Sequence, residues 1–305
     1  MTPLADKEGV FNSVDMFCPD DGRRLTPRCD GFSCGRCQRA YPLLNGCALD
    51  LRPGEPDRCE DFGARYAEQY RSIFFEPLTF EETRAPWGDP QSLSARERRA
   101  VERHVQWVSN RLLARVGDGS ALTLCDVSGG PGRYSLALSS AFKYVLHCDL
   151  SGRAISYVWN QARERGITNI GFIRCDYLQL PFSSSLPRII CLDTLIRGEE
   201  HERRLLHEIL HALAVDGVAL VDFHNWWHNP LRRLGLMPDN FVGNRSYSRR
   251  EVRELLPAQA HATIEAYHAE AMERRLVGTI LRLLPATRHG VLLARPGIPS
   301  ERTPT

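Results

Sequence analysis

The sequence is poor in lysine, in long apolar runs and in net charge. Lys7 and Lys143 are the only lysines among 39 basic residues, a bias that we attribute to coding preference and not to function. No apolar run approaches the roughly 18–20 residues of a membrane span. Residues 1–15 also lack the apolar segment of a signal peptide. These absences predict a cytoplasmic protein without membrane contact, whose cysteines stay reduced.

A formal net charge of +2 also argues against a dedicated nucleic-acid-binding protein, although a local basic patch is compatible with it. With 305 residues, of which 43% are hydrophobic and 25% charged, the chain has the composition of a globular protein. Its length is enough for two domains, or for one large domain with a small appendage.

Cysteine is plentiful but unevenly distributed. Six of the ten cysteines precede residue 60, and the other four, Cys125, Cys148, Cys175 and Cys191, are spread through the middle of the chain. The first three of these four immediately precede an aspartate at the end of an apolar run. We therefore interpret the later group as small apolar residues inside a sheet and not as a second metal site.

The segment 16–51 contains too little apolar material for a core and needs a staple such as a metal ion. Cys34-x-x-Cys37, with Cys18 upstream, supplies thiolates that bind Zn²⁺ tetrahedrally. The segment resembles the short zinc ribbons of the methyltransferase-activator and trans-regulator type, in which C-P-x-C-x-G-x-L precedes C-x-x-C-x-x-x-Y-P-x-x-x-G. CGRCQRAYPLLNG matches the second half, whereas CPDDGRRL places Asp21 where the second cysteine is expected.

The fourth zinc ligand is therefore either Asp21, whose carboxylate is an acceptable ligand, or the nearby Cys29. Two other interpretations stay open. The ribbon can have lost its metal, or Cys34 and Cys37 can form a redox pair, although the βαβ context typical of a redox C-x-x-C is missing around them.

From residue 121 the sequence alternates between strand and helix patterns. Near-continuous apolar runs predict strands at 122–127, 144–150, 170–177, 188–193, 218–224 and 290–296. Helical patterns lie before and between them, at 94–116, 132–142, 151–166, 199–217 and 248–256. Such repeats predict a doubly wound α/β domain, with helices on both faces of a parallel sheet.

Acidic residues close the first three of these strands. In CDVSGGPGRYS, Asp126 ends the first strand, and a glycine-rich turn follows whose backbone a ligand can approach closely. Asp149 ends the second strand, where an acid can accept both ribose hydroxyls of a nucleoside. Asp176 ends the third strand and could meet an adenine amino group. Ligands of such sheets bind outside the carboxyl ends of the strands, so the three acids mark one binding edge.

These residues resemble the motifs of the class I S-adenosylmethionine-dependent methyltransferases. The first motif, an acid-containing strand that runs into G-x-G-x-G, is matched by Asp126, Gly130 and Gly132, with Ser128 in place of the first glycine. HCDLS, RCDYLQLPF, RIICLDTL and LLHEILHALAVDGVALVDF are similar to the motifs that follow. A dinucleotide-dependent oxidoreductase would prefer G-x-G-x-x-G, which this turn does not offer.

The likeness covers residues 62–296 and implies a Rossmann-like seven-stranded methyltransferase sheet with an antiparallel final hairpin. The implied organisation is a zinc-ribbon-like module at 1–55, a linker and helical cap at 56–118, the methyltransferase domain at 119–296 and a disordered tail at 297–305. S-adenosylmethionine is the implied cofactor. The residues implied to hold it are Asp126, Ser128, Gly129, Gly130, Gly132, Asp149, Leu150, Asp176, Tyr177 and Asp193.

A small-molecule methyl acceptor, methylated on oxygen, is the substrate that we expect. His201 and His224 follow the fourth strand and end the fifth, near the expected methyl position, and either is a candidate general base or an ordinary surface or core histidine. Aromatic residues could cap an apolar acceptor pocket or simply pack in a core: Tyr66, Tyr70, Phe74, Phe75, Trp226 and Trp227.

Two alternatives concern the same domain. Some 23S rRNA guanine methyltransferases resemble this layout, and the ribbon is rich in arginine, which keeps RNA as a possible substrate: Arg23, Arg24, Arg28, Arg36 and Arg39. The other alternative is an inactive pseudo-methyltransferase in which Ser128 disrupts cofactor binding.

A competing motif lies in the fourth helix of the alternation. His207-Glu208-x-x-His211 matches the H-E-x-x-H signature of zinc proteases. No clear third ligand follows it, and the charged sequence EEHERR before it favours solvated histidines.

Overall fold

The structure, a computed structural model, describes residues 8–11, 13–55, 94–114, 116–195, 198–225, 234, 245–267 and 286–295. The aromatic residues expected to cap an acceptor pocket and the expected tail at 297–305 lie outside these ranges.

One mixed sheet of eleven strands runs through the described residues, in the order β1-β2-β3-β4-β7-β6-β5-β8-β9-β11-β10. The four strands of the cysteine-rich segment are β1 (Leu25–Arg28), β2 (Gly31–Cys34), β3 (Ala40–Leu44) and β4 (Ala48–Asp50). The other seven are β5 (Thr123–Val127), β6 (Tyr144–Asp149), β7 (Ile170–Arg174), β8 (Leu186–Leu195), β9 (Leu213–His224), β10 (His261–Tyr267) and β11 (Arg288–Ala294).

The seven strands from β5 to β11 confirm the expected methyltransferase sheet. Strands β7, β6, β5, β8 and β9 are parallel neighbours, and β11 lies antiparallel between β9 and β10. Strands β5 and β7 are buried along their whole length, as strands covered on both faces should be.

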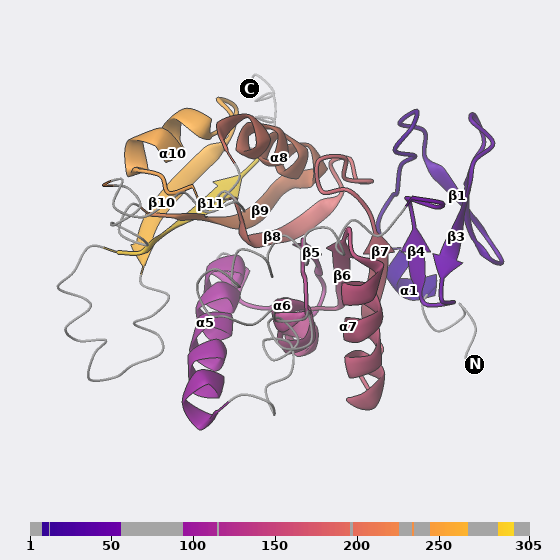
Figure 1. Cartoon of the computed structure of the whole chain (residues 1–305), viewed down its shortest axis with the longest axis horizontal. Coiled ribbons are helices and arrows are strands. Elements are labelled where there is room, and N and C mark those ends of the chain that lie inside the picture. The colour runs from indigo at the N-terminus through magenta and orange to yellow at the C-terminus, as the bar shows by residue number, and fades with distance from the viewer. Residues whose placement is uncertain are drawn as a thin grey trace, which may run out of the picture.

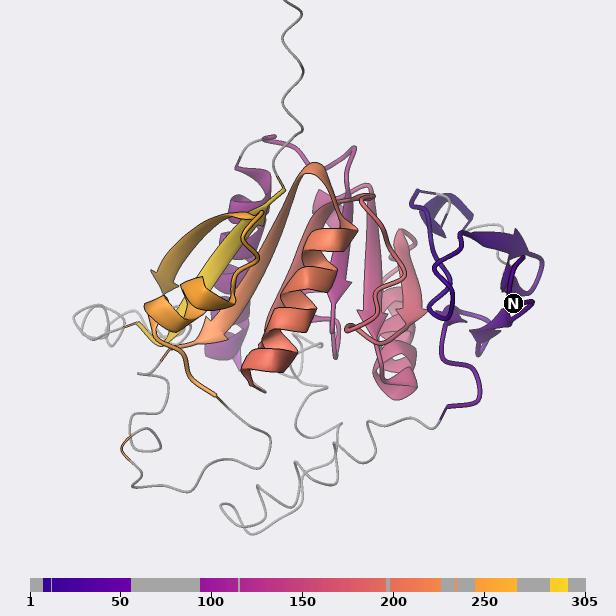
Figure 2. The same cartoon turned by 90° about the horizontal axis from the view of Figure 1, so that it is seen from above.

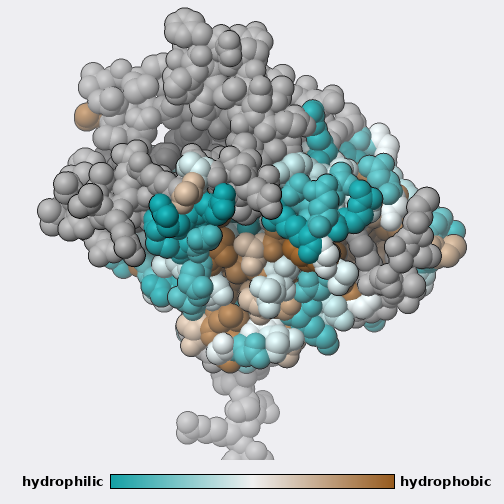
Figure 3. All heavy atoms as spheres, turned by 90° about the horizontal axis from the view of Figure 1, so that it is seen from below, coloured by the Kyte–Doolittle hydropathy of each residue, from teal (hydrophilic) through white to brown (hydrophobic). Residues whose placement is uncertain are grey.

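Helices cover both faces of this sheet (Figures 1 and 2). One face carries α5 (Ala95–Leu113), α6 (Arg133–Leu138) and α7 (Gly152–Glu164), whose apolar residues share one core with the sheet. The other face carries α8 (Glu199–Ala212) and α10 (Arg249–Leu255), which share a second core with the cysteine-rich segment and the short helix α1 (Glu8–Phe11). Viewed from below, the described residues present mostly hydrophilic side chains with apolar ones between them (Figure 3).

The cysteine-rich segment is not separate from the main sheet. Strand β4 pairs in parallel with β7, so that Ala48 faces Phe172 and Asp50 faces Arg174. Three consecutive residues were too short a pattern for the sequence to predict this strand. Residues 13–55, called the N-terminal module below, therefore extend the methyltransferase sheet at the β7 edge.

Several element boundaries differ from those expected, and two of the differences bear on the sheet and the site. The helix expected at 199–217 ends at Ala212, because Leu213 already pairs with Leu186 of β8 and begins β9. The third strand ends at Arg174, so Asp176 follows the strand instead of closing it. Among the described residues, no helix combines the length and the apolar character that a membrane crossing needs.

Candidate functional site

The glycine-rich turn between β5 and α6 has left-handed backbone at three positions. The φ angles of Ser128, Gly130 and Gly132 are 59°, 52° and 78°. Glycine adopts this conformation without a steric penalty, whereas a residue with a Cβ is strained in it. Ser128 therefore keeps the left-handed backbone of a glycine position at a cost in strain.

A buried polar network supports the turn from below. A Cβ at Gly129 would lie 2.5 Å from His147 Nδ1, so only glycine permits this close approach. Asp126 Oδ2 accepts a hydrogen bond of 2.6 Å from Ser135 Oγ, which is itself 2.9 Å from His147 Nδ1. Burial raises the pKa of Asp126 to about 7 and lowers the pKa of His147 to about 3. Asp126 thus stabilises the turn through this hydrogen-bond network.

Asp149 connects the turn to the next helix. Its Oδ2 accepts a hydrogen bond of 2.8 Å from the backbone N–H of Gly130, and its Oδ1 accepts one of 2.8 Å from that of Ser151. Ser151 is also the N-cap of α7, because its side chain accepts a bond from the N–H of Ala154. An ionised carboxylate can accept about four hydrogen bonds, so Asp149 is fixed in place and can still receive hydroxyl donors.

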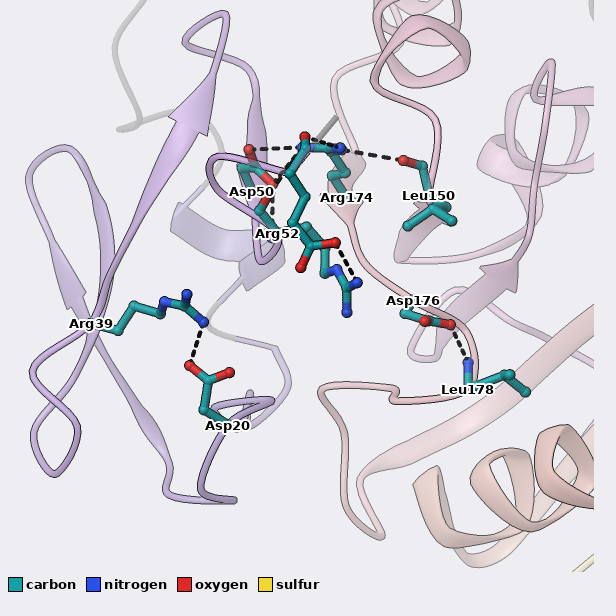
Figure 4. Close-up of polar contacts among 9 residues, drawn as sticks. Asp20, Arg39, Asp50, Arg52, Leu150, Arg174, Asp176 and Leu178 are labelled. Carbon is teal, nitrogen blue, oxygen red and sulfur yellow. Dashed lines mark hydrogen bonds and ion pairs between the residues drawn. The ribbon is translucent and has the colours of Figure 1, made fainter. Parts of the chain in front are cut away.

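The loop after β7 contains the third acid. Asp176 Oδ1 accepts a hydrogen bond of 2.9 Å from the N–H of Leu178 (Figure 4). Next to it, the Tyr177 hydroxyl lies 3.0 Å from His201 Nε2. His201, one of the two candidate bases, therefore contacts the loop that carries Asp176.

The second candidate base lies at the end of β9, beside Asp193. His224 is buried, and its Nε2 lies 3.9 Å from Asp193 Oδ1. Arg288 Nη1 is 2.7 Å from the same oxygen, and Asp222 Oδ1 accepts a bond of 2.7 Å from the N–H of Asp193. The Asp193 side chain is half exposed, and the nearby Arg288 and His224 hold its pKa well below the usual range against the opposing effect of desolvation. Asp193 and His224 thus form a pair at the carboxyl end of β8 and β9.

His104 on α5 is a residue that the sequence did not single out. Its side chain is 7% exposed, its Nδ1 lies 3.2 Å from the Tyr134 hydroxyl, and its ring packs against Trp107 and Tyr267. Its Nε2 is buried and has no hydrogen-bond partner among the residues that the structure describes. Burial, helped by the charge of Arg133, lowers the pKa of His104 to about 4, so the imidazole is neutral at pH 7. A buried polar atom without a partner is costly unless a ligand or water satisfies it.

The N-terminal module brings four of the five expected metal ligands together. The ligand atoms of Cys18, Asp21, Cys34 and Cys37 lie within 4.8 Å of one another. Cys29 is exposed and is not part of this group. Of the two alternatives for the fourth position, the geometry therefore favours Asp21.

The spacing of these atoms fits a tetrahedral zinc site. Zn–S bonds of about 2.3 Å place two sulfurs of a tetrahedron about 3.8 Å apart, and Cys18 Sγ and Cys37 Sγ are 3.7 Å apart. Asp21 Oδ2 lies 3.2 Å from Cys34 Sγ. A bond from the backbone N–H of Arg23 lowers the pKa of Asp21 and keeps it in the ionised form that binds metal.

The H-E-x-x-H sequence of α8 does not form a comparable group. His207 and His211 are exposed, and Glu208 Oε2 accepts a hydrogen bond of 3.1 Å from the N–H of Leu180. Over the residues that the structure describes, the one group of metal-ligating side chains is that of the N-terminal module.

Comparison with known proteins finds a methyltransferase domain model that matches part of this chain. Residues 125–221 match the family model described as a methyltransferase domain. A search of curated proteins found no match to the sequence.

Solved structures share the fold. The PH0226 protein from Pyrococcus horikoshii OT3 is 16% identical, with a TM-score of 0.52 over 71% of this chain and 98% of that chain. The geranyl diphosphate C-methyltransferase from Streptomyces coelicolor A3(2), solved with Mg²⁺, geranyl diphosphate and S-adenosyl-L-homocysteine, is 18% identical, with a TM-score of 0.50 over 81% of this chain and 100% of that chain. Residues 125–221 therefore match a methyltransferase domain, within a chain that has an α/β methyltransferase fold.

Proposed function

We propose that this domain binds S-adenosylmethionine at the carboxyl ends of β5, β6 and β7 and transfers its methyl group to an oxygen atom of a small molecule. The observation that supports this most strongly is the 2.8 Å bond from the Gly130 N–H to Asp149. It joins the glycine turn to the ribose-binding acid, so that one ligand can meet both.

The chain's own residues bind and orient the reactants. When bound, S-adenosylmethionine supplies an electrophilic methyl group on a sulfonium centre. Asp149 accepts bonds from the ribose hydroxyls, Asp176 accepts one from the adenine amino group, and the backbone of Gly129 and Gly130 borders the ligand. Holding the methyl group in line with the acceptor supplies much of the rate enhancement.

The acceptor oxygen lies beside the pair of Asp193 and His224 in this proposal. His224 would take the proton of the acceptor hydroxyl when its oxygen receives the methyl group. Asp193 orients the imidazole and stabilises its charge. The Nε2 of His104, which has no hydrogen-bond partner among the described residues, is available to bond the same methyl-acceptor molecule.

Charge pairing in the N-terminal module favours a small molecule over RNA. Arg24, Arg28 and Arg39 each form an ion pair with an aspartate, which reduces the positive charge that phosphate contacts need. Binding to bulk RNA at about 50 mM salt tests this point. We expect no gel shift, and a salt-dependent shift would favour the rRNA alternative.

Calorimetric titration of the full chain with S-adenosyl-L-homocysteine tests the cofactor site. We expect one binding site in the wild type and a loss of affinity of about tenfold or more in Asp149→Ala, because two or more hydrogen bonds to the ribose disappear. Asp118→Ala is the matched control, since Asp118 is an exposed acid whose hydrogen bonds, within the part of the chain that the structure describes, are to its neighbours Gly119 and Ser120. No heat in the wild type, together with no thermal shift, would favour the pseudo-methyltransferase.

The N-terminal module binds one zinc ion through Cys18, Asp21, Cys34 and Cys37 in this account. The ion would supply the folding energy that a module of this size lacks. The reducing cytoplasm predicted from the sequence would keep these cysteines reduced, as zinc binding requires. Elemental analysis of the purified chain should find one zinc per molecule, and a metal-free protein that is fully folded would contradict this assignment.

A further inference from the structure

The N-terminal module contacts the adenine side of the proposed cofactor site through its backbone. Strand β4 pairs with β7, and beyond this pairing the N–H of Leu51 donates a bond of 3.0 Å to the carbonyl of Arg174. Arg174 is the last residue of β7 and precedes Asp176 by two positions. The module therefore abuts the point where β7 leads into the loop of Asp176.

Arg174 joins the module to both nucleotide-binding loops (Figure 4). Its side chain is 6% exposed and forms an ion pair of 3.3 Å with Asp50, which is also buried. The same guanidinium donates to the carbonyls of Arg52 at 3.1 Å and Glu55 at 3.0 Å. Its Nε donates to the carbonyl of Leu150 at 3.2 Å.

The bond from Arg174 to Leu150 lies next to the proposed ribose-binding acid. Leu150 directly follows Asp149, and the carbonyl of Asp149 in turn accepts a bond of 3.0 Å from the N–H of Cys175. A guanidinium has five donors in a rigid plane, so it can fix several carbonyls at once. Arg174 thus holds the backbone next to the ribose-binding acid from one side and the module from the other.

A second set of contacts ties the module to the loop after Asp176. Gln179 Nε2 donates a bond of 2.7 Å to the carbonyl of Pro19, which follows the metal-site residue Cys18. The N–H of Phe17 donates a bond of 2.8 Å to the carbonyl of Pro181. The turn that contains Cys18 therefore contacts the loop after Asp176 through two hydrogen bonds.

We propose that Arg174 is a positioning residue of the cofactor site, and that Asp50 of the N-terminal module keeps it in place. This inference rests on the proposed function, because it assumes that Asp149 and Asp176 bind the nucleoside. Arg174 does not touch the cofactor. It fixes the loops of both acids, so that the module contributes to cofactor affinity as well as to stability.

Titration with S-adenosyl-L-homocysteine, run well below the unfolding temperature of each variant, tests the inference. In Arg174→Lys the charge stays but the planar fork is lost, and we expect the dissociation constant to rise about tenfold. Arg188→Lys is the matched control. Arg188 is 4% exposed and also bonds two carbonyls, those of Leu112 and Pro187, but it lies near the amino end of β8, away from the carboxyl ends of the strands where the cofactor is proposed to bind.

The two variants should lose comparable thermal stability, and only Arg174→Lys should lose affinity. An unchanged dissociation constant in Arg174→Lys, or an equal rise in both variants, overturns the inference. If Arg174→Lys does not fold, Asp50→Asn decides in its place: a rise of about threefold supports a positioning role, and an unchanged value overturns it. A wild type that binds no S-adenosyl-L-homocysteine overturns the proposed function itself, and the inference falls with it.

Discussion

The two groups of cysteines in this chain differ in the groups that lie beside their sulfur atoms. In the N-terminal module, the thiols of Cys18, Cys34 and Cys37 converge on one point together with a carboxylate. In the main sheet, Cys125 and Cys148 are fully buried among apolar side chains, with their sulfurs 3.7 Å apart. Burial raises the pKa of the Cys125 thiol, and the contact with the Cys125 sulfur raises the pKa of the Cys148 thiol. Cys18 and Cys34 are buried in the same apolar core as Cys125 and Cys148. The carboxylate that lies beside the converging thiols therefore distinguishes the metal site, and the degree of burial does not.

The largest effect should come from removing a metal ligand. Cys37→Ser should lose the zinc ion and several kcal/mol of stability, because binding of a structural zinc contributes on the order of 10 kcal/mol to folding. Cys29→Ser is the control, since Cys29 is exposed and outside the ligand group. Metal analysis and thermal unfolding of the two variants check this. Zinc loss in Cys29→Ser as well would contradict the assignment of Cys29 as a residue outside the metal site.

The stability contributed by His104, which is buried beside the main sheet, should respond to acid and not to chelators. His104 is neutral in the fold, with a pKa lowered to about 4, and its unfolded pKa is about 6.5. The unfolded chain therefore binds more protons between these values, so stability is full above about pH 6.5 and is lost as the pH falls toward 4, by on the order of 3 kcal/mol. In His104→Phe this part of the loss should disappear. Urea unfolding at several pH values measures it, and parallel curves for the two proteins would contradict it.

A smaller effect is expected from the cysteines of the sheet. Cys148→Ala should cost about 1 kcal/mol, because it removes one buried sulfur atom and leaves a small cavity. Its zinc content should equal that of the wild type. Denaturant unfolding with parallel metal analysis tests this, and loss of zinc would mean that the two cysteine groups are coupled.

The smallest effect concerns the turn at the binding edge. Ser128 has a φ of 59°, a conformation that glycine adopts without strain. Ser128→Gly should stabilise the protein by about 0.5 kcal/mol, since relief of the strain is offset in part by the entropy of the unfolded glycine. Affinity for S-adenosyl-L-homocysteine should not fall. A clear drop in melting temperature would show that the serine side chain stabilises the turn.

The sequence predicted the main sheet well because its strands are continuous apolar runs, each followed by a recognisable turn or acid. It did not predict β4, since Ala48, Leu49 and Asp50 are too few to show a period. It also missed His104, because a histidine among the charged residues of α5 looks solvated until the packing of Trp107 and Tyr134 around it is known. Arg174 was missed for the same reason: its partner Asp50 lies 124 positions away in the sequence.

The candidate site was predictable where one local motif contains it. The glycine turn, Asp149 and the C-x-x-C pair each depend on spacing within a few residues. The choice between Asp21 and Cys29 depended on how the chain folds back, because both are close to Cys34 in sequence but only the Asp21 carboxylate lies beside its sulfur.

The claim that the early cysteines hold a metal with a carboxylate as fourth ligand is tested most directly by the zinc K-edge X-ray absorption spectrum of the full chain. This account predicts three sulfurs at about 2.3 Å and one oxygen at about 2.0 Å. Four sulfurs, which would require Cys29 as a ligand, or an absence of bound zinc in the folded protein, would contradict it.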